Sequence, residues 1–560
     1  HIQGVQADDL AAEGVVSRLV HTGEPAQRGD IVSVDGTVLA TDVPRYTIEA
    51  NPREIAKFER KAASGRVLAK AAGAAELLAP VIGWDEAELR EALDTDGTWV
   101  PLVPDASPAL TRQIVELNVT GVFANLYYQR SYPAGAVAGN IVGYPYMGDE
   151  DEDHPDHYTG LELTQDKLLR GTPGERTVEV GGGGQPIPGG QASGTPAVTG
   201  CEITLTIDSD LQWEALNAID RQVSDFGADS GLVVAIDIKS GEILAIADSG
   251  TVNPLEAQEQ GLAGGSRAVQ DIFEPGSTGK VVTMAMVLET GEATPGTTYA
   301  VPWTATFGGQ EFKDHAEHGV MNWTLNDVLG QSSNIGTLMA AQNIADQTRY
   351  DYLAKFGFGE ATGVELPSEN PGILHVPGTQ WWDGRTRNTV LFGQGVAVNG
   401  LQAAGVYQIV GNAGVAMPLH LIRGWQCPDG TSGAPSLGQG TRVISEETAS
   451  TLIGMLESAV DEGTGGPAKI TGYRVAGKTG TSEMIGKDGT ADYFVSSFIG
   501  VAPADDPRVA VAVIVNGAQS SSWGAVVAAP VFKKVASFAL QRLDVPPSTS
   551  EPIKMPTTSQ

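Results

Sequence analysis

The stretch FEPGSTGKVV, residues 273–282, places Ser277 three positions before Lys280 and directly after the pair Pro275-Gly276. Pro-Gly is typical of a tight turn, and the apolar run that follows predicts a buried helix. If the helix begins at Ser277, the hydroxyl and the amine share one face and come within hydrogen-bond reach. A nucleophilic serine needs such a base, because its hydroxyl is protonated at neutral pH. Alone, however, the pattern favours a capping serine beside a surface lysine.

Two more motifs follow along the chain. The segment QSSNIG contains Ser332 and Asn334 in an SxN pattern before a helical run. The segment GKTGTSE precedes a strand-rich region and contains Lys478, Thr479, Gly480 and Thr481. One SxxK is expected by chance in a chain of this length, but SxxK, SxN and KTG in this order form a specific signal. Together the motifs favour Ser277 as a nucleophile and Lys280 as its base.

The composition excludes several classes of function. The 560 residues include 35 basic and 68 acidic ones, a formal net charge of −33, which argues against a nucleic-acid partner or docking on anionic lipid. Apolar residues make up 41% of the chain, enough for packed cores in roughly two to four domains. We expect no cofactor and no metal site, because no CxxC occurs and the close pair His315 and His318 fits a solvated loop.

Cysteine usage and the chain start bear on the cellular compartment. Cys201 and Cys427 could form a disulfide, but sequence alone does not show whether they are close. No run of 18 apolar residues occurs. The sequence begins at His1 rather than Met, so we expect a signal or anchor segment to precede it in the native protein.

The first part of the chain alternates short strands with helices. DIVSVDGTVLA predicts a hairpin that turns at Asp35-Gly36. We expect helices over 52–81, 84–94 and 108–118. Residues 180–200 are so rich in Gly and Pro that they mark a linker or long hairpin and a domain boundary.

The second part predicts an α+β domain. ITLTIDSDLQ indicates a strand and then a helix that starts at Asp208, and GLVVAIDIKSGEILAIAD, 231–248, is a hairpin signal. Apolar helical runs at 281–290, 335–344 and 447–460 alternate with strands at 495–502 and 508–516. This order favours helices packed on an antiparallel sheet. The Pro/Ser/Thr-rich tail, 544–560, is expected to be disordered.

The three motifs resemble the active site of penicillin-binding proteins and serine β-lactamases. QRGDIVSVDGTVLA, RSYPAGAVAGNIVGY and GLELTQDKLLRGTPGERTVEV resemble the pedestal of class B penicillin-binding proteins, and FGQGVAVNGLQ and GAVVAAPVF resemble their transpeptidase domain. The resemblance covers roughly residues 20–540. HAEHGVMNWTLNDVLGQSSNIGTLMAAQ is most similar to the division-specific, FtsI-like members of Gram-positive actinobacteria.

This resemblance implies a fold and domain boundaries. An elongated pedestal of the dimerisation type would occupy residues 1–200, and a serine β-lactamase-like transpeptidase domain, with an antiparallel sheet flanked by helices, residues 201–543. This chain departs from the family pattern at one point, in the first pedestal motif. Family members carry an Asp-Arg-Asn-Gly type of turn, whereas this chain has Ser33-Val34-Asp35-Gly36, which keeps the glycine but lacks the arginine.

The resemblance also implies D,D-transpeptidase chemistry. Ser277 would attack the bond between the last two D-alanines of a stem peptide, with Lys280 as general base and Ser332 as proton relay. Asn334 would bind the substrate amide and hold Lys280. Lys478 would attract the substrate carboxylate. Substrate or β-lactam would also contact Thr479, Gly480 and Thr481, with the N–H groups of Ser277 and Thr481 as oxyanion donors. Gly480 would leave the strand edge open to substrate.

Implied partners are a D-Ala-D-Ala donor and an amine acceptor from peptidoglycan stem peptides, β-lactam antibiotics, a membrane glycan polymerase and other division proteins. The implied location is the cell membrane, with one N-terminal anchor helix and an extracytoplasmic catalytic domain. Rival interpretations are an elongation-type transpeptidase, a β-lactam sensor and a β-lactamase. A β-lactamase needs a deacylating glutamate, and the one similar stretch, VELN at 115–118, lies upstream of Ser277. We expect Glu274 to be a local structural partner rather than an acid catalyst.

Overall fold

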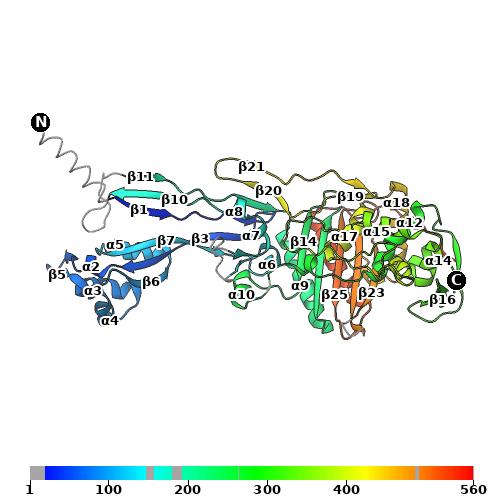
Figure 1. The fold of residues 1–560 in the computed structure, drawn as a ribbon, viewed down its shortest axis with the longest axis horizontal. Helices are drawn as coiled ribbons and strands as arrows, with labels where there is room; N and C mark the ends of the chain where they lie inside the picture. The colour runs from blue at the N-terminus through cyan, green and yellow to red at the C-terminus, as the bar shows by residue number, and fades with distance from the viewer. Residues whose placement is uncertain (1–18, 147–156, 180–191, 263, 486–490, 559–560) are drawn as a thin grey trace.

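The computed structural model describes residues 19–146, 157–179, 192–262, 264–485 and 491–558. The molecule is elongated, with strands and small helices of the N-terminal part at one end and a larger body of helices around a sheet at the other (Figure 1). Within the described ranges, no helix is both long enough and apolar enough to cross a bilayer.

The N-terminal part is built on a long sheet that reaches into the second half of the chain. Its order is β21-β20-β12-β2-β3-β6, and β7 pairs with β3. The strands are β2 (Ile31–Val32), β3 (Val38–Ala50), β6 (Val100–Ala106), β7 (Val122–Ser131), β12 (Glu202–Leu205), β20 (Ile422–Gln426) and β21 (Ser432–Gly433). A second sheet joins β1 (Leu19–Glu24), β10 (Gly174–Glu179) and β11 (Ala192–Thr195). Cys201 and Cys427, whose pairing the sequence left open, form a disulfide beside β12 and β20.

The prediction of one helix over 52–81 was wrong. The structure has α2 (Pro52–Ile55), a hairpin of β4 (Glu59–Lys61) and β5 (Val67–Ala69), and then α3 (Lys70–Ile82). The hairpin turns at Gly65, whose φ of 84° favours glycine. Leu68 on β5 is buried in the small core of this head, so tertiary packing overrides the local helix preference. The helices expected at 84–94 and 108–118 are present as α4 (Glu86–Leu93) and α5 (Pro108–Glu116).

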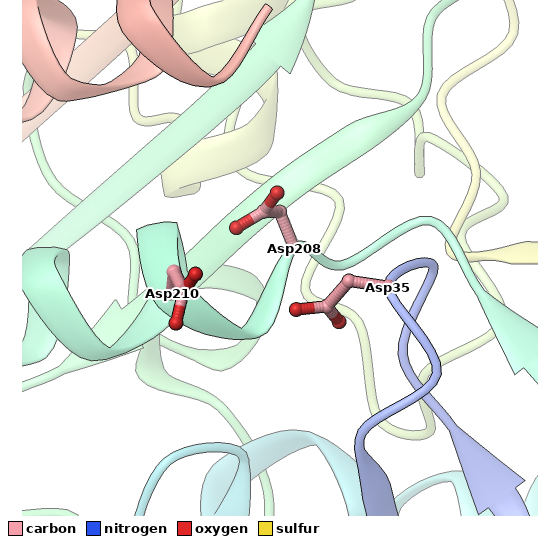
Figure 2. A group of neighbouring side chains, drawn as sticks. All are labelled: Asp35, Asp208 and Asp210. Carbon is pink, nitrogen blue, oxygen red and sulfur yellow. The ribbon is translucent and has the colours of Figure 1, made fainter.

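The hairpin turn at Asp35, which itself lacks an arginine, lies close to an arginine near the C-terminal end of the chain. Asp35, Asp208 and Asp210 lie together (Figure 2). Arg542 pairs with Asp208 at 2.7 Å and lies 3.9 Å from Asp35, and the Ser209 hydroxyl donates to Asp35 (2.7 Å). These carboxylates have the spacing of metal ligands, but Arg542 already neutralises part of their charge. We interpret the group as an ionic junction between the two parts of the chain.

A buried ion cluster joins the three segments that resemble a pedestal. Glu162, which is fully buried, accepts from the guanidinium groups of Arg28 (2.5 Å) and Arg130 (2.7 Å). Arg28 also pairs with Asp166, and Arg130 also pairs with Asp42. Because Arg28, Arg130 and Glu162 come from three distant segments, this cluster fixes their relative positions.

Removing one member of this cluster should be costly. We expect Glu162→Gln to lower the free energy of unfolding by about 3–5 kcal/mol, because it leaves two buried guanidinium groups short of negative charge. Chemical denaturation monitored by circular dichroism measures this. The matched control is Asp105→Asn, which breaks the exposed pair with Arg45 and should change little. Equal denaturation midpoints for the two variants would contradict the stabilising role of the buried ion cluster.

The C-terminal part is centred on a five-stranded antiparallel sheet in the order β14-β13-β25-β24-β23. The strands are β13 (Ser230–Asp237), β14 (Ile243–Asp248), β23 (Ala476–Ile485), β24 (Ala491–Ala502) and β25 (Val509–Asn516). The expected hairpin and both expected strands are therefore confirmed. The central strands are apolar on both faces, as in the VAVAVIV run of β25, because helices cover both sides.

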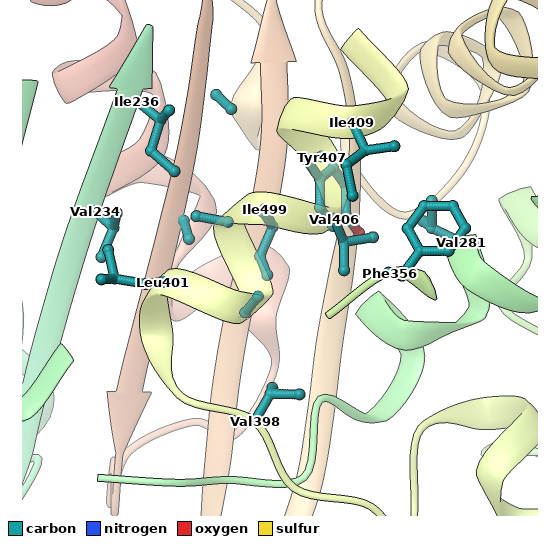
Figure 3. Packing of buried hydrophobic residues seen from close by; sticks show 14 of the residues in the cluster. Val234, Ile236, Val281, Phe356, Val398, Leu401, Val406, Tyr407, Ile409 and Ile499 are labelled. Carbon is teal, nitrogen blue, oxygen red and sulfur yellow. The ribbon is translucent and has the colours of Figure 1, made fainter. Parts of the chain in front are cut away.

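Alternate residues of the strands enter two different cores. Val233 and Ala235 face the core of α9 (Ser209–Phe226) and α20 (Ala529–Arg542), and α9 starts after Asp208 as expected. Val234 and Ile236 face α17 (Gly400–Gly411), which contributes Leu401, Val406 and Tyr407 (Figure 3). Beyond α17 lies α12 (Lys280–Glu289), the helix predicted after Ser277.

The remaining elements surround this frame. Helices α14 (Asn334–Ala341) and α18 (Glu446–Asp461) match the expected runs. Others are α13 (Leu325–Gly330), α15 (Asp346–Lys355), α19 (Gly524–Val527), β15 (Thr298–Val301), β16 (Thr304–Phe307), β17 (Gln310–Lys313) and β18 (Met321–Thr324). Short helices are α6 (Gly139–Val142), α7 (Gly160–Thr164), α8 (Asp166–Leu169), α10 (Pro254–Glu259), α11 (Arg267–Gln270) and α16 (Thr386–Thr389), and short strands β8 (Pro145–Tyr146), β9 (His157–Tyr158), β19 (Val415–Ala416) and β22 (Thr441–Arg442).

The C-terminal tail differs from the disorder expected of it. Residues 544–558 form neither helix nor strand, yet they are hydrogen-bonded to the domain at several points. The Tyr473 hydroxyl donates to the carbonyl of Val545 (2.7 Å), and the Thr558 N–H donates to Asp327 (2.9 Å). The hydroxyl groups of the segment find partners on the domain, as Ser548 and Ser550 do on Asp505.

Candidate active site

Ser277 lies on a tight turn that leads directly into the buried helix. The turn is the 3-10 segment η1 (Gly276–Gly279), and the backbone N–H of Lys280 donates to the Ser277 carbonyl. Residues three apart eclipse one another in such a turn, so Ser277 and Lys280 share one face, as expected. Gly276 has a φ of 54°, and its N–H donates to Gly393 (2.9 Å). The turn that presents Ser277 therefore needs a glycine.

Neighbouring segments hold this turn from several sides. The Glu274 carboxylate accepts from the N–H of Gly395 (2.8 Å), and its carbonyl accepts from the Ser482 hydroxyl (2.7 Å). The buried Tyr407 hydroxyl on α17 donates to the carbonyl of Thr278 (3.1 Å). Glu274 thus connects the loop at Gly395 with strand β23 beside Ser277, in agreement with the structural role expected of it.

Lys280 is fully buried and reaches across to the SxN motif. Its Nζ donates to the carbonyl of Ser332 (2.6 Å) and lies 3.4 Å from the Ser332 hydroxyl. Ser332 has a φ of 62°, a left-handed conformation that is uncommon for serine and turns its carbonyl toward the amine. Burial, and then the nearby Lys478, hold the pKa of Lys280 well below its usual range, while Asp314 opposes them.

Lys478 lies on β23, the edge strand of the sheet. It is fully buried, and burial lowers the pKa of its amine to about 7. Its Nζ donates to the carbonyl of Thr479 (3.2 Å), whose hydroxyl lies 2.8 Å from that of Thr464. The Thr481 hydroxyl donates to the carbonyl of Ser522 (3.1 Å), in the loop before α19. The KTG strand therefore brings a second low-pKa amine beside Lys280.

Gly480 has a packing role besides the substrate access expected of it. A Cβ at this position would lie 2.3 Å from the Ser497 hydroxyl and 2.9 Å from the Thr278 side chain. The missing side chain thus lets β23 pack directly against η1 and β24. The absence of a Cβ sets the distance between the KTG strand and the serine turn.

Asn334 begins α14 but does not hold Lys280 in this structure. Its amide donates to the carbonyl of Lys313 (3.2 Å), and the contact to Lys280 comes from Ser332 instead. The structure thus brings Lys280, Ser332 and Lys478 together, with Ser277 on the same turn as Lys280 and Asn334 at the start of α14.

Asp314 is a residue of the site that the sequence prediction missed. It is buried, and one carboxylate oxygen accepts from the N–H groups of Asn334 (2.6 Å) and Ile335 (2.9 Å). The other oxygen accepts from the Ser333 hydroxyl (2.6 Å). Asp314 therefore caps α14 and holds the SxN turn. Its only sequence signal is its place directly before the histidine pair in KDHAEHG.

The histidine pair lies on a largely exposed loop, as expected, but both rings contact neighbouring side chains. His318 lies 3.1 Å from the Asp314 carboxylate, and its ring packs against Trp323. The His315 ring lies edge-on to Trp523, with ring centroids 5.8 Å apart. Partial burial and the nearby Lys280 lower the pKa of His315. The loop therefore forms part of the wall of the site, although His315 itself remains exposed.

Replacing Asp314 should disturb both the helix cap and the chemistry. We expect Asp314→Ala to cost about 2 kcal/mol of stability through the lost cap, and to slow acylation on the order of tenfold to a hundredfold because Ser332 shifts against Lys280. Thermal melts and acylation kinetics with a chromogenic cephalosporin measure the two effects. Glu317→Ala, an exposed carboxylate in the same loop, is the matched control. An Asp314→Ala enzyme with normal kinetics would refute this positioning role.

Comparison with known families defines the class of protein. Residues 231–537 match the family described as penicillin binding protein transpeptidase domain, and residues 23–205 match the penicillin-binding protein dimerisation domain. The chain therefore belongs to the penicillin-binding proteins, and among them to the division-type, FtsI-like class B members.

Individual relatives support this placement. Penicillin-binding protein PbpB of Mycolicibacterium smegmatis is 36% identical over 85% of this chain and 74% of its own length. Peptidoglycan D,D-transpeptidase FtsI of Escherichia coli is 31% identical over 98% of this chain and 89% of its own. A peptidoglycan synthetase from Bifidobacterium adolescentis has a TM-score of 0.78 at 35% identity and covers 97% of this chain and 100% of its own. Penicillin binding protein 3 from Mycobacterium tuberculosis, complexed with aztreonam, has a TM-score of 0.71 at 29% identity. That match covers 96% of this chain and 100% of its own.

Proposed function

We propose that this protein is a peptidoglycan D,D-transpeptidase of septal cell-wall synthesis that works through an acyl-enzyme on Ser277 and is inhibited covalently by β-lactams. The observation that carries the proposal is the buried amine of Lys280, which is held against Ser332 on the same face as Ser277 and whose pKa burial lowers well below its usual range. Neutral lysine can accept a proton, which an ordinary lysine at neutral pH cannot.

Acylation follows from this arrangement. The Ser277 hydroxyl adds to the carbonyl between the last two D-alanines of the donor stem peptide, and its proton passes to Lys280 Nζ. The N–H groups of Ser277 and Thr481 receive the oxyanion. The C–N bond then breaks, and Ser332 relays the proton to the departing D-alanine amine. An ester on Ser277 remains.

Deacylation completes the crosslink. The amine of a second stem peptide loses a proton to the same base and adds to the ester carbonyl. The C–O bond to Ser277 breaks, a new amide forms, and the proton returns to the serine. Donor and product differ only in the amine joined to the acyl group, so no cofactor is consumed.

Substrate binding is assigned to the edge strand and its flank. An extended peptide can pair with β23 as an added strand along Thr479, Gly480 and Thr481. Lys478 directs positive charge toward the terminal carboxylate, and Asn334 offers its amide to the peptide bond. A β-lactam, with a carboxylate beside a strained amide, fits the same contacts.

The direct test supplies a stem peptide that ends in D-Ala-D-Ala together with an amine acceptor. Mass spectrometry should detect released D-alanine and the joined peptides in equal amounts. Release with water alone as acceptor would favour a hydrolase, and no release from a folded enzyme would refute the proposal. The second candidate function is that of an elongation-type transpeptidase. It predicts the same products and differs only in where in the cell wall the enzyme works. Fluorescence imaging should find the protein at septa, whereas signal along the side wall would favour the alternative.

We assign the catalytic part to the extracytoplasmic side of the cell membrane, behind an N-terminal anchor helix. The disulfide between Cys201 and Cys427 supports this side, since such bonds persist in oxidising compartments. A membrane glycan polymerase and other division proteins would then be partners, with the pedestal as the contact surface. Purified chain incubated with lipid-linked precursor alone should make no glycan strands, and strands made without a partner would contradict this division of labour.

A further inference from the structure

The last part of the chain follows a defined path over the transpeptidase domain. We name residues 545–558, which follow α20, the C-terminal strap. Val545 is buried in the core shared by α9 and α20, so the strap starts from a fixed point. From there it contacts three elements that are far apart in sequence: the entry to β23, helix α18 and helix α13.

The first anchor lies at the entry to the KTG strand. The Ser548 N–H donates to the carbonyl of Gly472 (2.9 Å), and its hydroxyl accepts from the N–H of Arg474 (3.1 Å). The guanidinium of Arg474 donates to Ser550 (2.8 Å) and, through two bonds of 2.6 Å, to the buried Glu457 on α18. Arg474 lies two residues before β23. The strap and α18 therefore fix the start of the strand that carries Lys478.

The second anchor is a notch in α18. A Cβ on Gly454 would lie 1.9 Å from the terminal methyl of Met555, and its nearest neighbours all belong to Met555. Pro556 similarly covers Gly296, where a Cβ would lie 3.6 Å from the proline ring. Glycine inside a helix costs stability relative to alanine. At Gly454 this glycine leaves the space that Met555 occupies.

The third anchor is on the helix that leads into the SxN motif. The Thr324 hydroxyl donates to the carbonyl of Pro556 (2.9 Å). The N–H and hydroxyl of Thr558 both donate to Asp327 (2.9 and 3.0 Å). Thr324 and Asp327 form the capping box of α13. That helix ends at Gly330, so the strap fixes the N-terminal end of the element whose C-terminal end leads directly to Ser332.

We propose that the C-terminal strap is a positioning element for acylation. It holds α13 and the entry to β23 against α18, and so sets Ser332 and Lys478 in register with Lys280. The strap does not reach the reacting atoms; it acts through the helix cap and through Arg474. This inference rests on the proposed acylation of Ser277.

The test compares the full chain with one that ends after Pro546, which keeps the buried Val545. Stopped-flow kinetics with a fluorescent penicillin separate the initial binding constant from the acylation rate constant. We expect the acylation rate constant to fall about tenfold or more, with a smaller change in initial binding. A synthetic peptide of residues 547–560, added in trans, should restore part of the rate. Hydrogen exchange should speed up over 325–334 in the shortened chain.

Two point variants keep the proposal testable if the shortened chain fails to fold. Met555→Ala empties the notch, and Gly454→Leu fills it with a good helix former, so both should slow acylation while the melting temperature changes little. Lys554→Ala, at an exposed strap position, is the matched control. The proposed role of the strap would be overturned if either point variant, or the shortened chain, acylated with the same rate constant as the full chain. A full chain that no penicillin labels would refute the proposed function instead.

Discussion

Ser277→Ala will not form a covalent adduct with a fluorescent penicillin, although it will fold like the parent. The Ser277 hydroxyl oxygen is the only protein atom in the proposed mechanism that bonds to the acyl group, and the turn that carries it is held by backbone contacts that alanine keeps. Losing a nucleophile of this kind reduces the rate at least about 10⁴-fold.

A denaturing gel after incubation with the penicillin measures this loss. Ser520→Ala, an exposed serine in the loop before α19, is the matched control and should label like the parent. Circular dichroism confirms that both variants fold. Labelling of Ser277→Ala at the parent's intensity would show that another residue is acylated.

Lys280→Met will fold but acylate about 10²- to 10⁴-fold more slowly, the range by which general bases accelerate reactions. Methionine fills a similar buried volume without an amine, so the fold should tolerate the change. The contact to the Ser332 carbonyl is lost with the base. Acylation kinetics at neutral pH measure the defect. Lys313→Met, an exposed lysine beside Asp314, is the control.

The pH dependence of the parent tests the same base. Because the pKa of Lys280 lies well below its usual 10.5, acylation should already be fast at neutral pH and should fall as acid protonates the amine. Lys478, with a pKa of about 7, should lose its charge as pH rises through that value. The initial binding of a β-lactam carboxylate should then weaken. An acylation rate that rises only near pH 10 would contradict a neutral Lys280.

Elements with a regular apolar pattern could be predicted from the sequence. The 231–248 hairpin, the strands β24 and β25, and α12 were found because both faces of the sheet and all sides of α12 are buried, which leaves a continuous apolar run. The three motifs predicted the site residues from their order along the chain, although only some lie on regular elements: Ser277 is on the turn before α12, Ser332 is in the turn before α14, and Lys478 is on β23.

Features that depend on distant contacts could not be predicted in this way. The hairpin at 59–69 exists because Leu68 enters a core formed by residues on both sides of it in sequence, from Ile48 to Val119. The role of Asp314 depends on its distance from α14, which no local pattern encodes. The tail after 543 has the composition of a disordered segment, but Gly454 and Asp327, far away in sequence, provide its binding sites.

The central claim is that Ser277 forms a covalent acyl-enzyme with Lys280 as its base. Mass spectrometry of the penicillin adduct tests it most directly. Intact protein should gain the mass of one whole penicillin molecule, and peptide mapping should place the adduct on Ser277. An adduct on any other residue, or hydrolysed penicillin with no adduct from a folded and active protein, would contradict the account.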